Sequence, residues 1–79
     1  MTAINKLLIL PLVSLNSERM RVLRVTKRLP QDEVAKQLGV TQALVSQWER
    51  GYREPGKAYR AKLARLLGVR VHDLFEVAS

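Results

Sequence analysis

The stretch that decides the fold spans residues 34–51 and has the sequence VAKQLGVTQALVSQWERG. Within it, Ala35, Gly39 and Val45 follow one another at intervals of four and six residues. A small side chain at Ala35 lets two helices cross closely, and Gly39 suits the left-handed conformation that ends a helix. Val45 can then pack the second helix back onto the first. The spacing therefore predicts two short helices joined by a glycine turn, the arrangement of a helix-turn-helix.

The second of these helices, expected over residues 42–50, separates apolar from polar side chains. At about 100° per residue, one face is apolar and carries Leu44, Val45 and Trp48. The opposite face is polar and carries Gln42, Ala43, Ser46, Gln47 and Arg50. Glutamine amides can pair bidentately with adenine edges, and alanine can contact a thymine methyl group. An ordinary solvated helix face is the alternative, but next to the glycine turn the pattern favours base recognition in a DNA major groove.

Capping residues and helix breakers place the elements around this unit. We expect five helices, over residues 18–28, 30–39, 42–50, 57–67 and 71–76. Asn16 or Ser17 can cap the first helix, and Pro30 suits the start of the second. Met20 and Leu23 should point inward, together with the stem of Lys27. The sequence therefore predicts an all-α domain over residues 17–79, preceded by an apolar N-terminal arm over residues 1–16.

Composition limits the classes of function. The chain has 79 residues, no cysteine, a net charge of +7 and a pI near 10.6. This excess of positive charge indicates a polyanionic partner, nucleic acid first and a membrane surface second. His72 has no second histidine or cysteine beside it, and no nucleophile–base pair or carboxylate pair stands out. We therefore expect no metal, no cofactor and no enzymatic activity. The absence of cysteine fits a cytoplasmic protein.

The arm is the least regular part of the sequence. Residues 4–15, INKLLILPLVSL, are too few to span a bilayer, which needs about 20 apolar residues, and no cleavage site follows them. Leu10 precedes Pro11, which favours extended backbone and a short β-strand. We expect Leu7 to Leu15 to pack across a twofold axis as paired strands or swapped arms. The predicted dimer contacts are Leu8, Leu10, Leu12, Leu15, Leu74 and Phe75. Alternatively, the natural start is Met20 and the arm is incidental.

The run from Met20 to Glu76 resembles the Xre/Cro-type family of phage-repressor-like helix-turn-helix domains. The residues that carry this resemblance are LRVTKRLPQDEVAKQLGVTQALVSQWERGYREP and KLARLLGVRVHDLF, within about three-quarters of the chain. The resemblance implies a five-helix, lambda-repressor-like fold. Two positions depart from the family pattern. Arg28 stands where glycine is usual, and Pro30 stands where threonine or serine caps the second helix.

The resemblance also implies roles for individual residues. The base-contacting positions would be Gln42, Ala43, Ser46 and Gln47. The phosphate-contacting positions would be Gln31, Thr41, Arg50, Tyr52 and Arg53. Gln31 would also brace Gln42, and Arg24 would pair with Glu49 to join the first helix to the third.

These observations predict a sequence-specific transcriptional regulator that binds a near-palindromic operator in double-stranded DNA as a homodimer. RNA polymerase is an expected protein partner, and both repression and activation are compatible with the sequence. One alternative is an antitoxin or anti-activator, a protein-binding module that uses the helix-turn-helix scaffold and the apolar arm. Another alternative is a peptide that binds a membrane surface. The polar face of residues 42–50 favours DNA over both.

Overall fold

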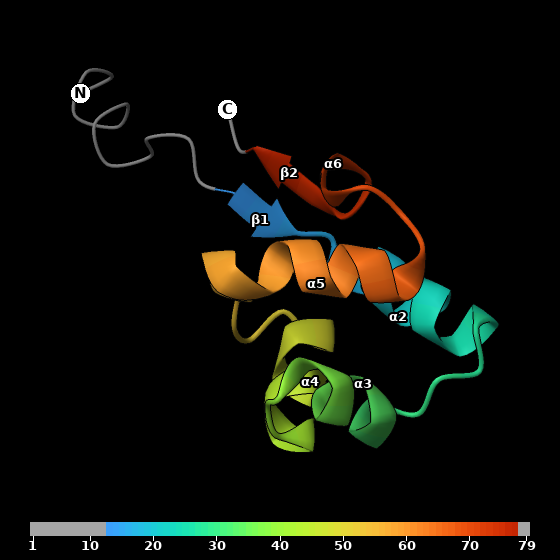
Figure 1. Cartoon of the computed structure of the whole chain (residues 1–79). Helices are drawn as coiled ribbons and strands as arrows, with labels where there is room; N and C mark the ends of the chain where they lie inside the picture. Colours follow the sequence, from blue (N-terminus) through green and yellow to red (C-terminus); the bar gives the residue numbers. More distant parts are fainter. Residues whose placement is uncertain (1–12, 78–79) are drawn as a thin grey trace, which may run out of the picture.

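The structure is a computed structural model that describes residues 13–77, and over this range it contains five helices and one two-stranded sheet (Figure 1). The elements in chain order are β1 (Val13–Leu15), α2 (Ser17–Thr26), α3 (Gln31–Leu38), α4 (Gln42–Glu49), α5 (Lys57–Leu67), α6 (Val71–Leu74) and β2 (Phe75–Val77). The predicted all-α class with five helices is confirmed, and each helix end lies within two residues of its expected position. Within residues 13–77 no helix is long and apolar enough to cross a bilayer.

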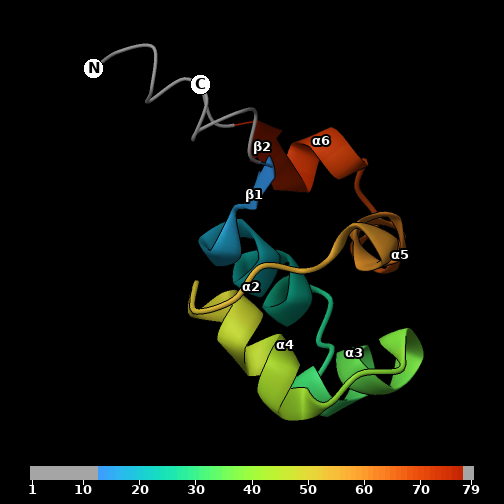
Figure 2. The same cartoon turned by 90° about the vertical axis from the view of Figure 1, so that its left-hand side faces the viewer.

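The elements form two ends joined by a middle layer. Helices α3 and α4 lie together at one end of the molecule, and the sheet lies with α6 at the opposite end (Figures 1 and 2). Helices α2 and α5 lie between these two ends, and α2 contacts both α4 and α5. This arrangement leaves α4 on the outside of the molecule while α2 supports it from behind.

The sheet corrects the expected end of the last helix and gives residues 13–15 a partner strand. The last helix was expected to continue to residue 76, but it ends at Leu74, and residues 75–77 form β2. This strand pairs antiparallel with β1, so that Leu15 lies opposite Phe75 and Ser14 opposite Glu76. Within residues 13–15, therefore, the arm pairs with a strand of its own chain. The physical reason is burial, because Leu15 and Phe75 both enter the core of one chain.

Two helices begin at residues whose side chains cap them. The Asn16 side chain accepts a hydrogen bond from the Arg19 backbone N–H at 3.0 Å. Thr41 Oγ1 accepts one from the Leu44 N–H at 3.1 Å. Each bond satisfies a backbone donor that has no partner inside the helix. Of the two capping candidates, Asn16 and not Ser17 caps α2. A residue before Met20 therefore stabilises the fold.

Four helices end in the same turn, in which a residue in the left-handed conformation follows the helix. In each, the next N–H bonds back to a carbonyl five residues earlier: Leu29 to Arg24, Val40 to Ala35, Tyr52 to Gln47 and Val69 to Ala64. The left-handed residue is glycine after α3, α4 and α5, with φ between 73° and 76°. After α2 it is Arg28, with φ 58°. The departure from the family pattern noted at this position therefore places a bulky side chain in a conformation that favours glycine.

One apolar core joins the helices to the sheet. The helices contribute Met20, Val34, Ala35, Leu38, Val45, Trp48, Leu63, Ala64 and Leu67. The sheet end contributes Leu15, Leu74 and Phe75. These last three were predicted to form dimer contacts, but they are buried within one chain and leave little surface for a partner. The other three predicted contacts, Leu8, Leu10 and Leu12, lie outside the described residues.

The stem of Lys27 was expected to point inward, but Lys27 is exposed, with its ammonium group beside Gly68 at the end of α5. Three other side chains have notable surroundings. Val71 is 39% exposed. Arg60 is half-buried, with its guanidinium 6.0 Å from the centre of the Phe75 ring. The Trp48 N–H is buried and has no hydrogen-bond partner among residues 13–77.

Candidate nucleic-acid interface

Helix α4 presents the predicted polar face to solvent. Gln42 and Ala43 are exposed, and Ser46 and Gln47 are half-buried on the same side. On the opposite side, Val45 and Trp48 are buried in the core. The helix is therefore held by its apolar side and is free to enter a groove by its polar side. Four side chains on that side are short or uncharged, so a partner can approach the helix closely.

The crossing of α3 and α4 fixes the direction in which this face points. Ala35 and Val45, the two residues predicted to make the crossing, are 4% and 0% exposed. Gly39 makes the turn between the helices, with φ 73°. Thr41 then starts α4 through its side-chain cap. Figure 2 shows α4 below α2, with α3 to the right of α4, so that no other helix covers the left side of α4.

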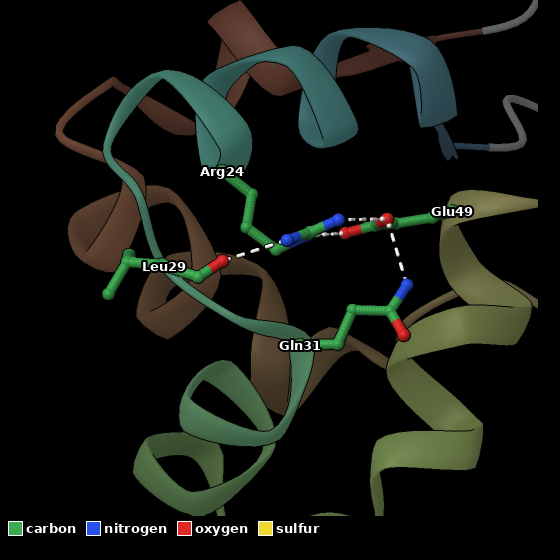
Figure 3. Close-up of polar contacts among 4 residues, drawn as sticks. All are labelled: Arg24, Leu29, Gln31 and Glu49. Carbon is green, nitrogen blue, oxygen red and sulfur yellow. Dashed lines mark hydrogen bonds and ion pairs between the residues drawn. The ribbon is translucent and has the colours of Figure 1, made fainter.

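An ion pair joins α2 to the end of α4, as predicted (Figure 3). The Arg24 guanidinium donates to both oxygens of the Glu49 carboxylate, from Nε to Oε2 and from Nη2 to Oε1, the latter at 3.1 Å. The two side chains are 13% and 4% exposed. Such two-pronged pairing fixes orientation as well as distance. The pair therefore sets the position of the C-terminal end of α4 relative to α2.

The same pair organises the start of α3. Arg24 Nη1 donates to the Leu29 carbonyl at 2.8 Å, and Gln31 Nε2 donates to Glu49 Oε1 at 3.1 Å (Figure 3). Gln31 was expected to brace Gln42, but among residues 13–77 no hydrogen bond joins the two. The competing partner is the buried Glu49 carboxylate, which needs more donors than Arg24 alone supplies. Glu49 thus orients the amide of Gln31.

The other candidate phosphate contacts lie at both ends of α4. Thr41 is exposed at the N-terminal end, although its hydroxyl caps the helix. Arg50, Tyr52 and Arg53 are exposed at the C-terminal end, and Tyr52 is 72% exposed. Cations at the end of a groove-binding helix are suitably placed for a nucleic-acid backbone. Within residues 13–77, no group of three or more histidine, cysteine or acidic side chains could hold a metal ion.

One contact near this site was not predicted. Glu54 Oε1 accepts a hydrogen bond from the Leu15 backbone N–H at 2.7 Å, and Oε2 lies 3.5 Å from the Ser14 hydroxyl that donates to it. The two bonds join the loop after α4 to β1. The residues lie 39 and 40 positions apart, and no local pattern connects them.

A helix pair with a glycine turn, whose second helix presents an uncovered polar face, defines the class of helix-turn-helix DNA-binding transcriptional regulators. The chain belongs to the helix-turn-helix family HTH_3, whose family model matches residues 20–74. The resemblance to phage-repressor-like domains is thereby confirmed.

Individual relatives agree with this assignment. The chain is 30% identical over 57 residues to an uncharacterized HTH-type transcriptional regulator from Methanocaldococcus jannaschii, covering 72% of this chain and 86% of the relative. The fold of this chain is similar to that of the P22 c2 repressor, solved with a synthetic operator. The TM-score is 0.70 and the identity 30%, covering 75% of this chain and 89% of the repressor. This chain is also similar to the restriction-modification controller protein C.AhdI from Aeromonas hydrophila, at a TM-score of 0.68 and 34% identity over the same shares of each chain.

Proposed function

We propose that this chain binds a near-palindromic operator in double-stranded DNA as a homodimer and regulates transcription from it. Helix α4 enters the major groove, where Gln42, Ala43, Ser46 and Gln47 contact base edges. The observation that carries the proposal is the division of α4, with Val45 and Trp48 buried and the amide-bearing side uncovered. Amides distinguish bases by their donor and acceptor pattern, whereas cations on this face would bind any sequence.

Phosphate contacts supply the affinity that is independent of sequence. The proposed contacts lie at the two ends of α4 and at the start of α3. They are Gln31, Thr41, Arg50, Tyr52 and Arg53. The net charge of +7 favours association with a polyanion and makes the affinity depend on salt. Two relatives with known structures are named as a repressor bound to an operator and as a controller protein, which supports a regulatory role.

Dimerisation follows from the small number of bases that one helix reaches. A single helix-turn-helix contacts one half-site, and two copies would contact half-sites about 34 Å apart, one turn of the duplex. The exposed apolar side chains Val22, Val25 and Val71 are available to a second copy, because Leu15, Leu74 and Phe75 are already buried.

The test is selection of binding sites from random duplex DNA at about 150 mM salt, a concentration at which non-specific binding is weak. The expected product is a near-palindromic site that binds two chains. Fluorescence anisotropy measures the affinity, and light scattering measures the stoichiometry. Gln42→Ala and Gln47→Ala should each reduce discrimination at one position by about 1–3 kcal/mol.

Gln37→Ala is the matched control, because Gln37 is an exposed glutamine on α3 that bonds to Glu33 and lies off the α4 face. It should leave the selected sequence unchanged. Binding that is equal for all sequences and insensitive to Gln42 and Gln47 would refute base recognition by α4. A selected site bound by a single chain would refute the dimer.

A further inference from the structure

Glu54 is an acidic residue in a place where its charge opposes the function. It directly follows Arg53, within the group of cations proposed to contact phosphate. A carboxylate at a DNA-facing loop repels the phosphate backbone. Its side chain, however, does not extend freely into solvent but reaches β1 at the sheet end of the molecule.

The contact between Glu54 and β1 gives a hydrogen-bond acceptor to a backbone N–H on the free edge of the strand. Asn16 N–H bonds to the Leu74 carbonyl at 2.9 Å, toward β2. Because successive N–H groups of a strand point in opposite directions, the N–H of Leu15 points away from β2. Glu54 Oε1 accepts this N–H at 2.7 Å. The bond is charge-assisted and short, and it covers an edge that would otherwise have no backbone partner.

The loop between α4 and α5 is thereby held at both of its ends. At its start, the N–H of Tyr52 bonds to the Gln47 carbonyl at 2.9 Å. At its end, Glu54 is bonded to β1, and the next residue, Pro55, is buried. Arg53 lies between these two fixed points, so its Cα has little freedom although its side chain is exposed.

We infer that Glu54 is a positioning residue for DNA binding, which fixes the loop that carries Tyr52 and Arg53 by bonding it to β1. This inference rests on the proposed function, because it takes Arg53 as a phosphate contact. Arg53 then meets the phosphate from an ordered backbone, and binding need not supply the cost of ordering the loop. The sheet made by the two ends of the described chain thus contributes to DNA affinity without touching DNA.

The test uses Glu54→Ala in the full chain, with affinity measured against the selected operator and against random duplex. The two explanations predict opposite signs. If Glu54 acted through its charge alone, its removal would tighten binding. If it positions the loop, removal should weaken binding to both DNAs by about 3- to 10-fold, the cost of ordering one or two side chains. The magnitude of the salt slope should stay nearly unchanged, because Arg53 still contacts phosphate once the loop is ordered.

Two further variants separate positioning from general damage. Glu54→Gln retains an oxygen that can accept the Leu15 N–H, so its affinity should lie between those of wild type and Glu54→Ala. Glu18→Ala removes the same charge from an exposed site on α2 and should not weaken binding. In an Arg53→Ala background, Glu54→Ala should have no further effect if it acts through Arg53.

A measurement without DNA completes the test. Backbone amide order parameters by NMR should fall for residues 52–54 in Glu54→Ala and stay unchanged in α2 and α3. Unchanged order in this loop, or tighter binding by Glu54→Ala, would overturn the inference. If wild type binds no DNA at all, the proposed function fails and the role of Glu54 in DNA binding fails with it, while the NMR result still decides whether Glu54 holds the loop.

Discussion

At the scale of single residues, the buried carboxylate of Glu49 decides how the binding helix is held. A charge that is 4% exposed is costly unless several donors compensate it, and here Arg24 and Gln31 both do. The same arginine also bonds to the Leu29 carbonyl, so one guanidinium supports both the end of α4 and the turn before α3. Removing either charged partner leaves the other one buried and unpaired.

Arg24→Ala or Glu49→Ala should therefore each lower the free energy of unfolding by about 3–5 kcal/mol, the cost of a stranded buried charge. Urea denaturation measures this change. The double substitution should cost much less than the sum of the two, because it strands no charge. Arg19→Ala, an exposed arginine on the same helix, should change stability by less than about 0.5 kcal/mol. Additive losses in the double variant would contradict the proposed coupling.

Arg28 offers a second test at this scale, because the chain itself contains three comparable turns that use glycine. A non-glycine residue in the left-handed conformation is strained by about 1–2 kcal/mol. Glycine removes this strain, but it loses more conformational entropy on folding, which offsets part of the gain. Arg28→Gly should therefore raise stability by about 1 kcal/mol, which corresponds to about 4–8 °C in melting temperature for a domain of this size. Arg28→Ala removes the same charge but retains the strain. Equal melting temperatures for the two variants would show that charge, and not φ, is the cause of any gain.

At the scale of elements, α6 shows how one side chain supports a helix of four residues. The backbone N–H of Arg70 donates to Asp73 Oδ2 at 3.1 Å, and this bond holds the pKa of the Asp73 carboxyl below its ordinary value of 3.8. The positive charges of Arg70 and His72 lower the pKa further. The carboxylate is thus favoured by the folded state, and it closes the first turn of α6 just before β2 begins.

The pH dependence follows from this sign. Because the pKa of Asp73 is lower in the folded chain than in the unfolded chain, its contribution is fully present above pH 3.8 and is lost as the pH falls through the folded pKa. Asp73→Asn should therefore melt at a lower temperature than wild type at pH 7, and the difference should shrink in strong acid. Thermal melts followed by circular dichroism, at pH 7 and in strong acid, measure this difference in melting temperature. A difference that does not depend on pH would contradict a role for the ionised carboxylate.

At the scale of the whole molecule, the sheet closes the domain by joining its two chain segments that are most distant in sequence. Val13 pairs with Val77, and Leu15 brings its side chain, 6% exposed, into the same core as Met20 and Trp48. Residues 13–19 therefore belong to the folded unit. A domain of this size has a small core, so each buried leucine matters.

Leu15→Ala in the full chain should lower the free energy of unfolding by about 2–5 kcal/mol, the usual cost of truncating a buried leucine. A chain that starts at Met20 should lose this and about 1 kcal/mol more, because the Asn16 cap is also removed. Denaturant titration compares the two chains with Lys62→Ala, an exposed residue on α5 that should matter little. A chain starting at Met20 that is as stable as wild type would contradict a structural role for β1.

Local sequence is sufficient to predict the helices, the glycine turn and the two faces of α4, because these depend on neighbours within a few positions. Thr41 caps the helix it precedes, Gly39 ends the helix it follows, and the spacing of Val45 and Trp48 sets the buried side of α4. The Arg24–Glu49 pair was predictable through the family resemblance, although 25 residues separate its partners.

Three features could not be predicted from local sequence: the pairing of β1 with β2, the partner of Gln31 and the contact of Glu54 with β1. Residues 71–76 have a helical pattern, but Phe75 leaves the helix and is buried in the core, paired with Leu15. Gln31 bonds to the carboxylate that folding buries beside it, and not to the residue that the family pattern indicates. Glu54 meets a backbone N–H, a donor that every non-proline residue carries, and so the residue type at position 15 carries no signal for it. Local patterns specify helices, whereas the partners of buried and strand-edge groups depend on which surfaces the whole chain brings together.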